Sequence, residues 1–214
     1  IPATLLSDEP CTIENLPDIE DVHALADILV ELGAKVDYEP GRFMRVDPRP
    51  AEGTEVSYKN AQRLRASYYL LGALLGRCGQ ANVPTPGGCE IGSRPVDQHL
   101  KGFQAIGAEA GEIGGMLTAK ADVLSGGDVF FDMVTVGATV NVMLAACKAK
   151  GNTTIYNAAK EPHIVDLANF LNSMGAKIRG AGTDIIRIRG VQYLHGSTHA
   201  GIPDQTETGP LPSA

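Results

Sequence analysis

The sequence is short of positive charge. It contains 18 lysines and arginines against 25 aspartates and glutamates, which gives a formal net charge of −7 at pH 7. Proteins that bind nucleic acid gather lysine and arginine to neutralise phosphate groups. The composition therefore argues against a nucleic-acid partner, although it is compatible with a local cationic site for a small anion.

Long apolar runs are also missing. No stretch of about 18 consecutive apolar residues occurs, which argues against a membrane-spanning helix. Residues 1–9 have neither the basic start nor the long apolar centre of a signal peptide. We therefore expect no membrane partner. The missing initiating methionine predicts a chain that was processed or cut from a longer one.

Cysteine is scarce. The four cysteines are Cys11, Cys78, Cys89 and Cys147. They form no C-x-x-C pair, and their spacing fits no zinc site. Scattered cysteines of this kind are typical of a reduced, cytoplasmic protein. His195 and His199 are spaced like metal ligands, but no further ligand is evident near them, so we expect no metal site.

The first part of the chain predicts a small α/β unit. Residues 11–16 alternate in polarity, as strands do. Asp18 is predicted to cap a helix whose apolar residues recur at helical spacing, and Gly33 to end that helix. Residues 34–38 and 43–46 then predict two strands that pair across a turn.

The same order of elements returns twice. The second copy consists of a strand-like run at 88–91 and a helix at 96–106. The third copy consists of a strand at 153–157, a helix at 163–174 and a strand at 185–189. The glycines that end the three helices are Gly33, Gly107 and Gly175, spaced by 74 and 68 residues. A nearly constant period predicts copies of one structural unit.

Two further helices are predicted between these copies, at residues 60–76 and 136–150. The second is apolar on nearly all sides, which favours a buried helix. The sequence therefore predicts an α/β fold with helices inside and sheets outside. We expect one domain over residues 1–209, with repeats at about 10–76, 84–150 and 151–209, and a tail or truncation junction at 210–214.

The loop at residues 85–95 carries Cys89 and Arg94 among two prolines and three glycines. Nearby cations and helix N-termini favour the reactive thiolate form of a cysteine. A free cysteine can equally be a small buried hydrophobic residue. Both interpretations are open for Cys89, whereas the other three cysteines are expected to be buried.

Two predicted helix starts could bind an anion. Thr135 and Gly137 begin the apolar helix, where unpaired backbone N–H groups point outward. An ordinary threonine cap with a small glycine for packing is the alternative. Arg94 and Pro95 open the other helix, and an arginine beside two helix N-termini suits a diphosphate. Arg63 and Arg65 are predicted to lie on different faces of their helix, and either could face the site.

Residues 86–100 read Pro-Gly-Gly-Cys-Glu-Ile-Gly-Ser-Arg-Pro-Val-Asp-Gln-His-Leu and resemble the UDP-N-acetylglucosamine enolpyruvyl transferases. Further segments that match family motifs, in family order, are 63–67, 134–139, 157–162 and 203–209. The resemblance implies transfer of an enolpyruvyl group from phosphoenolpyruvate to the 3-hydroxyl of UDP-N-acetylglucosamine, at the start of bacterial peptidoglycan synthesis. It implies no cofactor. It also implies two domains, each an inside-out α/β barrel of three pseudo-threefold repeats, with the site between them.

The resemblance also implies roles for individual residues. Cys89 is expected to be the proton donor, able to form an adduct with phosphoenolpyruvate, and the residue that fosfomycin alkylates. Arg65 is expected near the sugar nucleotide and the phosphate. The residues expected to hold the uridine are Arg94, Pro95, Val96, Asp97 and Gln98. The residues expected at the diphosphate are Met133, Val134, Thr135, Val136 and Gly137. Some family members carry a lysine in place of Met133.

The family's general-base carboxylate, and the arginine that grips phosphoenolpyruvate, belong to a second domain that this sequence lacks. We therefore expect the chain to be inactive alone. One alternative is a non-catalytic module that binds UDP-N-acetylglucosamine or serves as a scaffold. Another is the related enolpyruvyl-shikimate-phosphate synthase, but its phosphate-binding motifs, rich in arginine and lysine, are not seen here.

Overall fold

The computed structural model describes residues 1–64, 67–85 and 96–202. The helices in these ranges are η1 (Pro2–Leu6), α1 (Glu20–Glu31), α2 (Tyr58–Arg63), η2 (Ser67–Tyr69), α3 (Leu70–Cys78), α4 (Asp97–Ala105), α5 (Val136–Ala146) and α6 (Pro162–Ser173). The strands are β1 (Cys11–Glu14), β2 (Lys35–Glu39), β3 (Phe43–Asp47), β4 (Gln80–Pro84), β5 (Glu109–Ile113), β6 (Met116–Lys120), β7 (Asp128–Phe130), β8 (Asn152–Tyr156), β9 (Lys177–Arg179), β10 (Ile185–Arg189) and β11 (Thr198–Ala200).

The strands form three mixed sheets. Their strand orders are β11-β1-β3-β2, β4-β6-β5 and β7-β8-β10-β9. Each sheet contains an antiparallel trio in which the last strand in sequence lies in the middle. A parallel neighbour extends two of the trios, through β11 beside β1 and β7 beside β8. Beside β4 the corresponding contact is a single parallel bridge between Glu55 and Asn82.

Most predicted elements are confirmed. The hairpin predicted at residues 34–46 is β2 and β3, and the strands predicted in the third copy are β8 and β10. The helices predicted at 96–106 and 163–174 are α4 and α6, with ends that differ by one residue. Gly33, Gly107 and Gly175 have φ angles of +97°, +89° and +103°. Glycine reaches this left-handed region without the strain that a side chain would bring, so each glycine ends its helix.

The single helix predicted at residues 60–76 is wrong. The chain leaves the helical conformation at Leu64, whose φ and ψ are −124° and 107°, and a new helix, α3, begins at Leu70. A contact distant in sequence holds the start of the new helix. The Asn141 side-chain amide accepts a hydrogen bond from Gly72 N at 2.7 Å and donates to the Tyr68 carbonyl at 3.1 Å. This amide satisfies backbone groups at the start of α3.

Two other details depart from the sequence predictions. Asp18 does not cap α1, because the N-cap residue is Ile19 and makes no side-chain cap bond. The Asp18 carboxylate instead lies 2.7 Å from Nε2 of His23. The strand-like run at 88–91 lies outside the described residues. In this sheet β6 pairs with β4 on one side and β5 on the other, and β4 was not predicted from the sequence.

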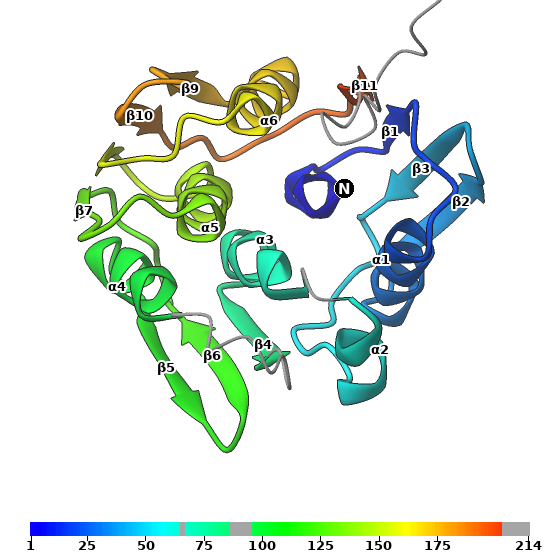
Figure 1. Ribbon diagram of the computed structural model, residues 1–214, viewed down its shortest axis with the longest axis horizontal. Helices are drawn as coiled ribbons and strands as arrows, with labels where there is room; N and C mark the ends of the chain where they lie inside the picture. The colour runs from blue at the N-terminus through cyan, green and yellow to red at the C-terminus, as the bar shows by residue number, and fades with distance from the viewer. Residues whose placement is uncertain (65–66, 86–95, 203–214) are drawn as a thin grey trace, which may run out of the picture.

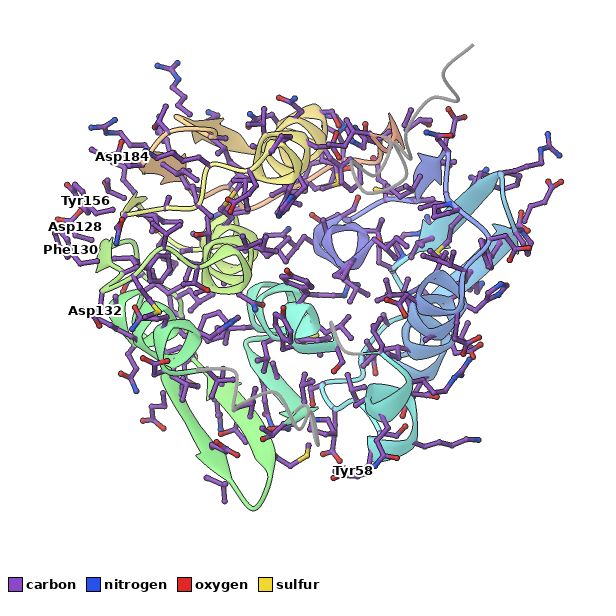
Figure 2. The ribbon with its side chains drawn as sticks, in the orientation of Figure 1. Tyr58, Asp128, Phe130, Asp132, Tyr156 and Asp184 are labelled. Carbon is purple, nitrogen blue, oxygen red and sulfur yellow. The ribbon has the colours of Figure 1, made fainter. Side chains whose placement is uncertain are left out.

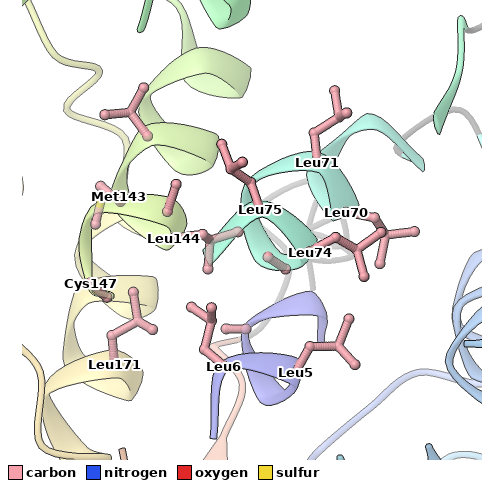
Figure 3. Close-up of a cluster of buried hydrophobic side chains, with 14 of the residues drawn as sticks. Leu5, Leu6, Leu70, Leu71, Leu74, Leu75, Met143, Leu144, Cys147 and Leu171 are labelled. Carbon is pink, nitrogen blue, oxygen red and sulfur yellow. The ribbon is translucent and has the colours of Figure 1, made fainter. Parts of the chain in front are cut away.

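Helices α3 and α5 lie near the middle of the view, with most strands toward the periphery (Figure 1). Phe130 and Tyr156 stack on the outer face of the sheet β7-β8-β10-β9 (Figure 2). Leucines of η1 and α3 meet apolar side chains of α5 in a buried cluster (Figure 3). Full burial of a leucine side chain contributes roughly 1.5–3 kcal/mol, so this cluster is a main source of stability. No helix in the described ranges is long and apolar enough to cross a membrane.

Arg77 ties η1 to the rest of this core. Its guanidinium donates hydrogen bonds to the carbonyls of Leu5, Ser7, Pro48 and Ala51 at 2.5–3.3 Å. Hydrogen bonds from a charged donor contribute more than neutral ones. Arg77 therefore fixes the short helix η1 against the C-terminal end of α3.

Candidate functional site

The first turns of α4 and α5 lie against each other. A Cβ atom placed on Gly137 would lie 2.9 Å from Cε1 of His99, and one placed on Gly102 would lie 2.4 Å from Val142. The Gly137–His99 contact lies near the N-terminal end of both helices, and the Gly102–Val142 contact lies further along both, so the two helices run in the same direction. Their N-terminal ends, where unpaired N–H groups favour anions, are therefore neighbours.

Gln98 joins α4 to the segment that leads into α5. Its Nε2 donates to Oδ2 of Asp97 at 2.9 Å and to Oδ2 of Asp132 at 3.0 Å, and its Oε1 accepts from Asp132 N at 3.0 Å. Gln98 is only 4% exposed. Both ends of its amide are used within the protein, so this side chain positions the segment around Asp132.

Two more side chains hold the same segment. Lys101 Nζ lies 2.6 Å from Oδ1 of Asp132. The side-chain hydrogen bonds from Lys101 and Gln98 lower the pKa of Asp132, which favours the carboxylate. On the other side, Asn157 Nδ2 donates to the Phe131 carbonyl at 3.1 Å. Asn157 has a φ of +59°, a left-handed conformation that asparagine tolerates better than most residues. The chain is therefore anchored immediately before Met133.

A buried polar group lies beneath the two helix starts. Asn141 Nδ2 lies 2.9 Å from Nδ1 of His99. Because Asn141 Oδ1 already accepts from Gly72 N, its nitrogen is the donor and the His99 ring is the acceptor. His99 also contacts the ring of Tyr68 edge-on, with centroids 5.3 Å apart. Burial lowers the pKa of His99 to about 4, so the ring is neutral near pH 7.

The first turn of α5 has no side-chain cap. Thr135 is the N-cap residue, but its side chain makes no cap hydrogen bond. The hydroxyl of Thr139 donates to the Thr135 carbonyl at 2.7 Å and accepts from Ala159 N at 3.1 Å. Met133 and Val134 are 55% and 53% exposed just before this turn. This geometry leaves the α5 N-terminus suited to bind an anion.

The described chain contains only part of the predicted site. Val96, Asp97 and Gln98 lie at the start of α4, and Met133 to Gly137 lie at the start of α5. The contacts above bring these two groups together. Four predicted site residues lie outside the described residues: Arg65, Cys89, Arg94 and Pro95.

Arg63 instead forms ion pairs with another helix of the fold. Its guanidinium lies 2.7 Å from Oε1 of Glu20 and 2.6 Å from Oδ2 of Asp27, both on α1. It therefore links α2 to α1. The helix pattern alone left the choice between Arg63 and Arg65 open, and the family resemblance implied Arg65.

The residues that support the site were not identified from the sequence. They are His99, Lys101, Asp132, Asn141 and Asn157. One signal was available: Asn141 interrupts an almost wholly apolar helix, and a buried amide needs partners. The partners themselves come from segments far away in the chain.

His195 and His199 make other contacts. His199 Nε2 lies 3.0 Å from Oδ1 of Asp166, and His195 Nδ1 lies 2.9 Å from the Gly196 carbonyl. Within the ranges that the structure describes, no group of three or more histidine, cysteine, aspartate or glutamate side chains could hold a metal ion.

Relatives in sequence are carboxyvinyltransferases. The chain is 53% identical over 210 residues to the UDP-N-acetylglucosamine 1-carboxyvinyltransferase of Clostridium botulinum, covering 98% of this chain and 50% of that protein. It is also 53% identical, over the same shares, to UDP-N-acetylglucosamine 1-carboxyvinyltransferase 3 of Caldanaerobacter subterraneus subsp. tengcongensis. The chain spans about half the length of the curated relatives it matches.

Solved structures share the fold. The enolpyruvyl transferase NikO of Streptomyces tendae superposes with a TM-score of 0.78 at 24% identity, over 95% of this chain and 48% of that one. EPSP synthase of Acinetobacter baumannii superposes with a TM-score of 0.69 at 15% identity, over 93% and 46%. The model of one family, described as EPSP synthase (3-phosphoshikimate 1-carboxyvinyltransferase), matches residues 1–214. The chain therefore belongs to the EPSP synthase family.

Proposed function

We propose that this chain is the part of an enolpyruvyl transferase that binds UDP-N-acetylglucosamine. The observation that carries the proposal is the 53% identity, over 98% of the chain, with a protein named UDP-N-acetylglucosamine 1-carboxyvinyltransferase. In the reaction, the 3-hydroxyl of the sugar loses its proton as its oxygen bonds to the carbon of phosphoenolpyruvate that carries the phosphate, while the methylene carbon gains a proton. That methylene-carbon proton is lost again as the bond from the neighbouring carbon to the phosphate oxygen breaks, the double bond re-forms and phosphate leaves. This step begins peptidoglycan synthesis, in the cytoplasm.

The two helix starts support a diphosphate site in this proposal. The first-turn N–H groups of α5 at Val136 and Gly137 would face the diphosphate, and Val96 and Asp97 would face the uridine. Arg65, Arg94 and Pro95 complete the proposed nucleotide site, and Cys89 is the proposed proton donor. Gln98 would act by positioning, because both ends of its amide bind within the protein.

We further propose that the fold is an inside-out α/β barrel of three pseudo-threefold repeats, in one domain over residues 1–209. The equivalent strand orders of the three antiparallel trios support this. The left-handed glycines that end α1, α4 and α6 support it as well. A second domain would supply the general base and the arginine that binds phosphoenolpyruvate. The 214-residue chain alone would therefore not convert the two substrates to product.

A chimera tests the proposal. This chain would replace the matching part of the Clostridium botulinum relative, and phosphate release would be measured with both substrates. We expect turnover by the chimera and none by the isolated chain. Turnover by the isolated chain would refute the need for a second domain. A folded chimera that binds UDP-N-acetylglucosamine in a calorimeter but releases no phosphate would favour a non-catalytic binding module.

Fosfomycin labelling tests the role of Cys89. We expect alkylation of the chimera at Cys89, detected by mass spectrometry, and none in the Cys89→Asp variant, which should keep proton donation. Cys11 and Cys147 serve as internal controls because both are fully buried. Burial also raises the pKa of Cys147 to about 12. Labelling that persists in this loop in the variant would remove Cys89 from the proposed role.

A further inference from the structure

Four cationic side chains gather on the outer face of the sheet β7-β8-β10-β9. Lys177 and Arg179 of β9 are exposed, as are Arg187 and Arg189 of β10. Arg187 lies directly opposite Arg179, and Arg189 directly opposite Lys177. Like charges in directly opposed positions destabilise a sheet. Within the described chain, none of these four side chains has an ion pair or a hydrogen bond.

Protection of the sheet edge explains only two of these four cationic residues, those on β9. The strand β9 is last in its sheet, and charged residues on such a strand discourage pairing with other chains. Arg187 and Arg189 lie on β10, which has neighbours on both sides. The edge argument does not apply to these two arginines. The chain as a whole is acidic, so general basicity does not explain them either.

Acidic and aromatic residues occupy the other side of the same face. Thr154 lies opposite both Arg187 and Asp128, which puts these three residues in one row across the sheet. In the neighbouring row, Phe130 stacks on Tyr156 with ring centroids 4.4 Å apart and planes 4° apart. Phe130 is 56% exposed. Such an exposed stacked pair offers apolar area to a partner.

One carboxylate on this side, Asp128 of β7, is exposed and takes part in no ion pair among the described residues. Asp184, which directly precedes Ile185 at the start of β10, is likewise exposed and without an ion pair there. Figure 2 shows Asp184, Asp128 and Phe130 along the same side of the molecule. Strands β7 and β9 are three strand spacings apart, or about 14 Å. The outer face therefore carries a cationic side and an acidic, aromatic side.

We propose that this outer face binds a second copy of the chain around a twofold axis. Such an interface is self-complementary, so cations of each copy would meet carboxylates of the other. The axis would pass near Thr154 and Tyr156, between the two sides, and would bring the aromatic rows together. An acidic partner protein would satisfy the arginines but would be repelled by Asp128 and Asp184. A net charge of −7 opposes association in general, so local complementarity must supply the attraction.

Sedimentation velocity of the 214-residue chain over a wide concentration range, at physiological salt, tests this. We expect a monomer–dimer equilibrium in the native chain. Arg187→Glu should raise the dissociation constant at least about tenfold, because a contact pair becomes repulsive. The matched control is Arg45→Glu on β3, an exposed position in another sheet. That variant should dimerise like the native chain.

Charge exchange makes the test specific. Asp128→Arg should also weaken dimerisation, and a mixture of this variant with Arg187→Glu should form the mixed dimer. A native chain that stays monomeric at all concentrations would overturn the proposal. The same holds if Arg187→Glu dimerises as tightly as the native chain, or if the mixture of the two variants forms no mixed dimer. Circular dichroism checks the fold of each variant. Arg187→Gln replaces Arg187→Glu, and Asp128→Asn replaces Asp128→Arg, if a reversal fails to fold.

Discussion

At the scale of single residues, the candidate site depends on a close contact at Gly137. His99 and Tyr68 fill the space beside its α-carbon. A glycine there lets the first turn of α5 approach α4 closely, so the sequence position matters for packing as well as for any anion. The packing alternative and the anion-site interpretation of Gly137 are therefore compatible.

Gly137→Ala should destabilise the fold by about 1–3 kcal/mol, the usual cost of overpacking a buried site. The new methyl group would lie 2.9 Å from Cε1 of His99 and 3.0 Å from Cε2 of Tyr68. Urea unfolding measures the change. Gly111→Ala is the control, because nothing lies within 4 Å of its added Cβ. A control that loses as much stability as Gly137→Ala would contradict this explanation.

His99 should make stability depend on pH. Its pKa is lowered from 6.5 to about 4 in the folded chain, so the unfolded chain binds the proton first as the pH falls. Stability should therefore decrease between pH 6.5 and 4, by up to roughly 3 kcal/mol. His99→Gln should lose this part of the pH dependence, measured by urea unfolding on either side of the window. The exposed His163→Gln is the control, and a pH profile of His99→Gln that matches the native one would refute the assignment.

At the scale of elements, side chains of one segment determine where another begins. The Asn141 amide of α5 defines the start of α3, and Gln98 of α4 holds the segment before α5. Hydrophobic periodicity predicted α4 and α6 to within one residue at each end, because each buries one regular face. It also predicted the buried helix α5, but α5 ends at Ala146 instead of residue 150, where Lys150 forms a parallel bridge with Ser125. It missed the break between α2 and α3 because the capping amide is about 70 residues away. It also missed the Gln98 contact, which no local pattern encodes.

Gln98→Leu should loosen the segment around Asp132 while leaving α4 intact. Leucine has a similar volume but leaves Asp132 N without its acceptor, a loss of about 1–3 kcal/mol locally. Hydrogen exchange at the Asp132 amide should become faster by at least about tenfold. Gln104→Leu on the same helix is the matched control, because in the part of the chain that the structure describes its amide donates to the Ala110 carbonyl and does not contact Asp132. Unchanged hydrogen exchange at the Asp132 amide in Gln98→Leu would show that the Gln98 side chain does not hold this segment.

At the scale of the whole molecule, α4 and α5 begin side by side, and we propose that the two helix starts form one nucleotide-binding surface. The residues alone predicted two separate helix starts that could each bind an anion. They left an ordinary threonine cap at Thr135 as the alternative. Only the fold brings the start of α4 beside the start of α5, through His99 against Gly137 and Gln98 against Asp132. The motif resemblance predicted this grouping, but packing contacts such as His99 against Gly137 explain it.

The most direct test is a titration of the isotope-labelled 214-residue chain with UDP-N-acetylglucosamine, followed by amide chemical shifts in NMR spectra. We predict concentration-dependent shifts centred on Val96–Gln98 and Met133–Gly137, with little change on the outer face of β10. Weak binding, in the millimolar range, is sufficient, because the proposed site would be completed by a second domain. Shifts confined to other regions, or no shifts at saturating nucleotide, would contradict the account.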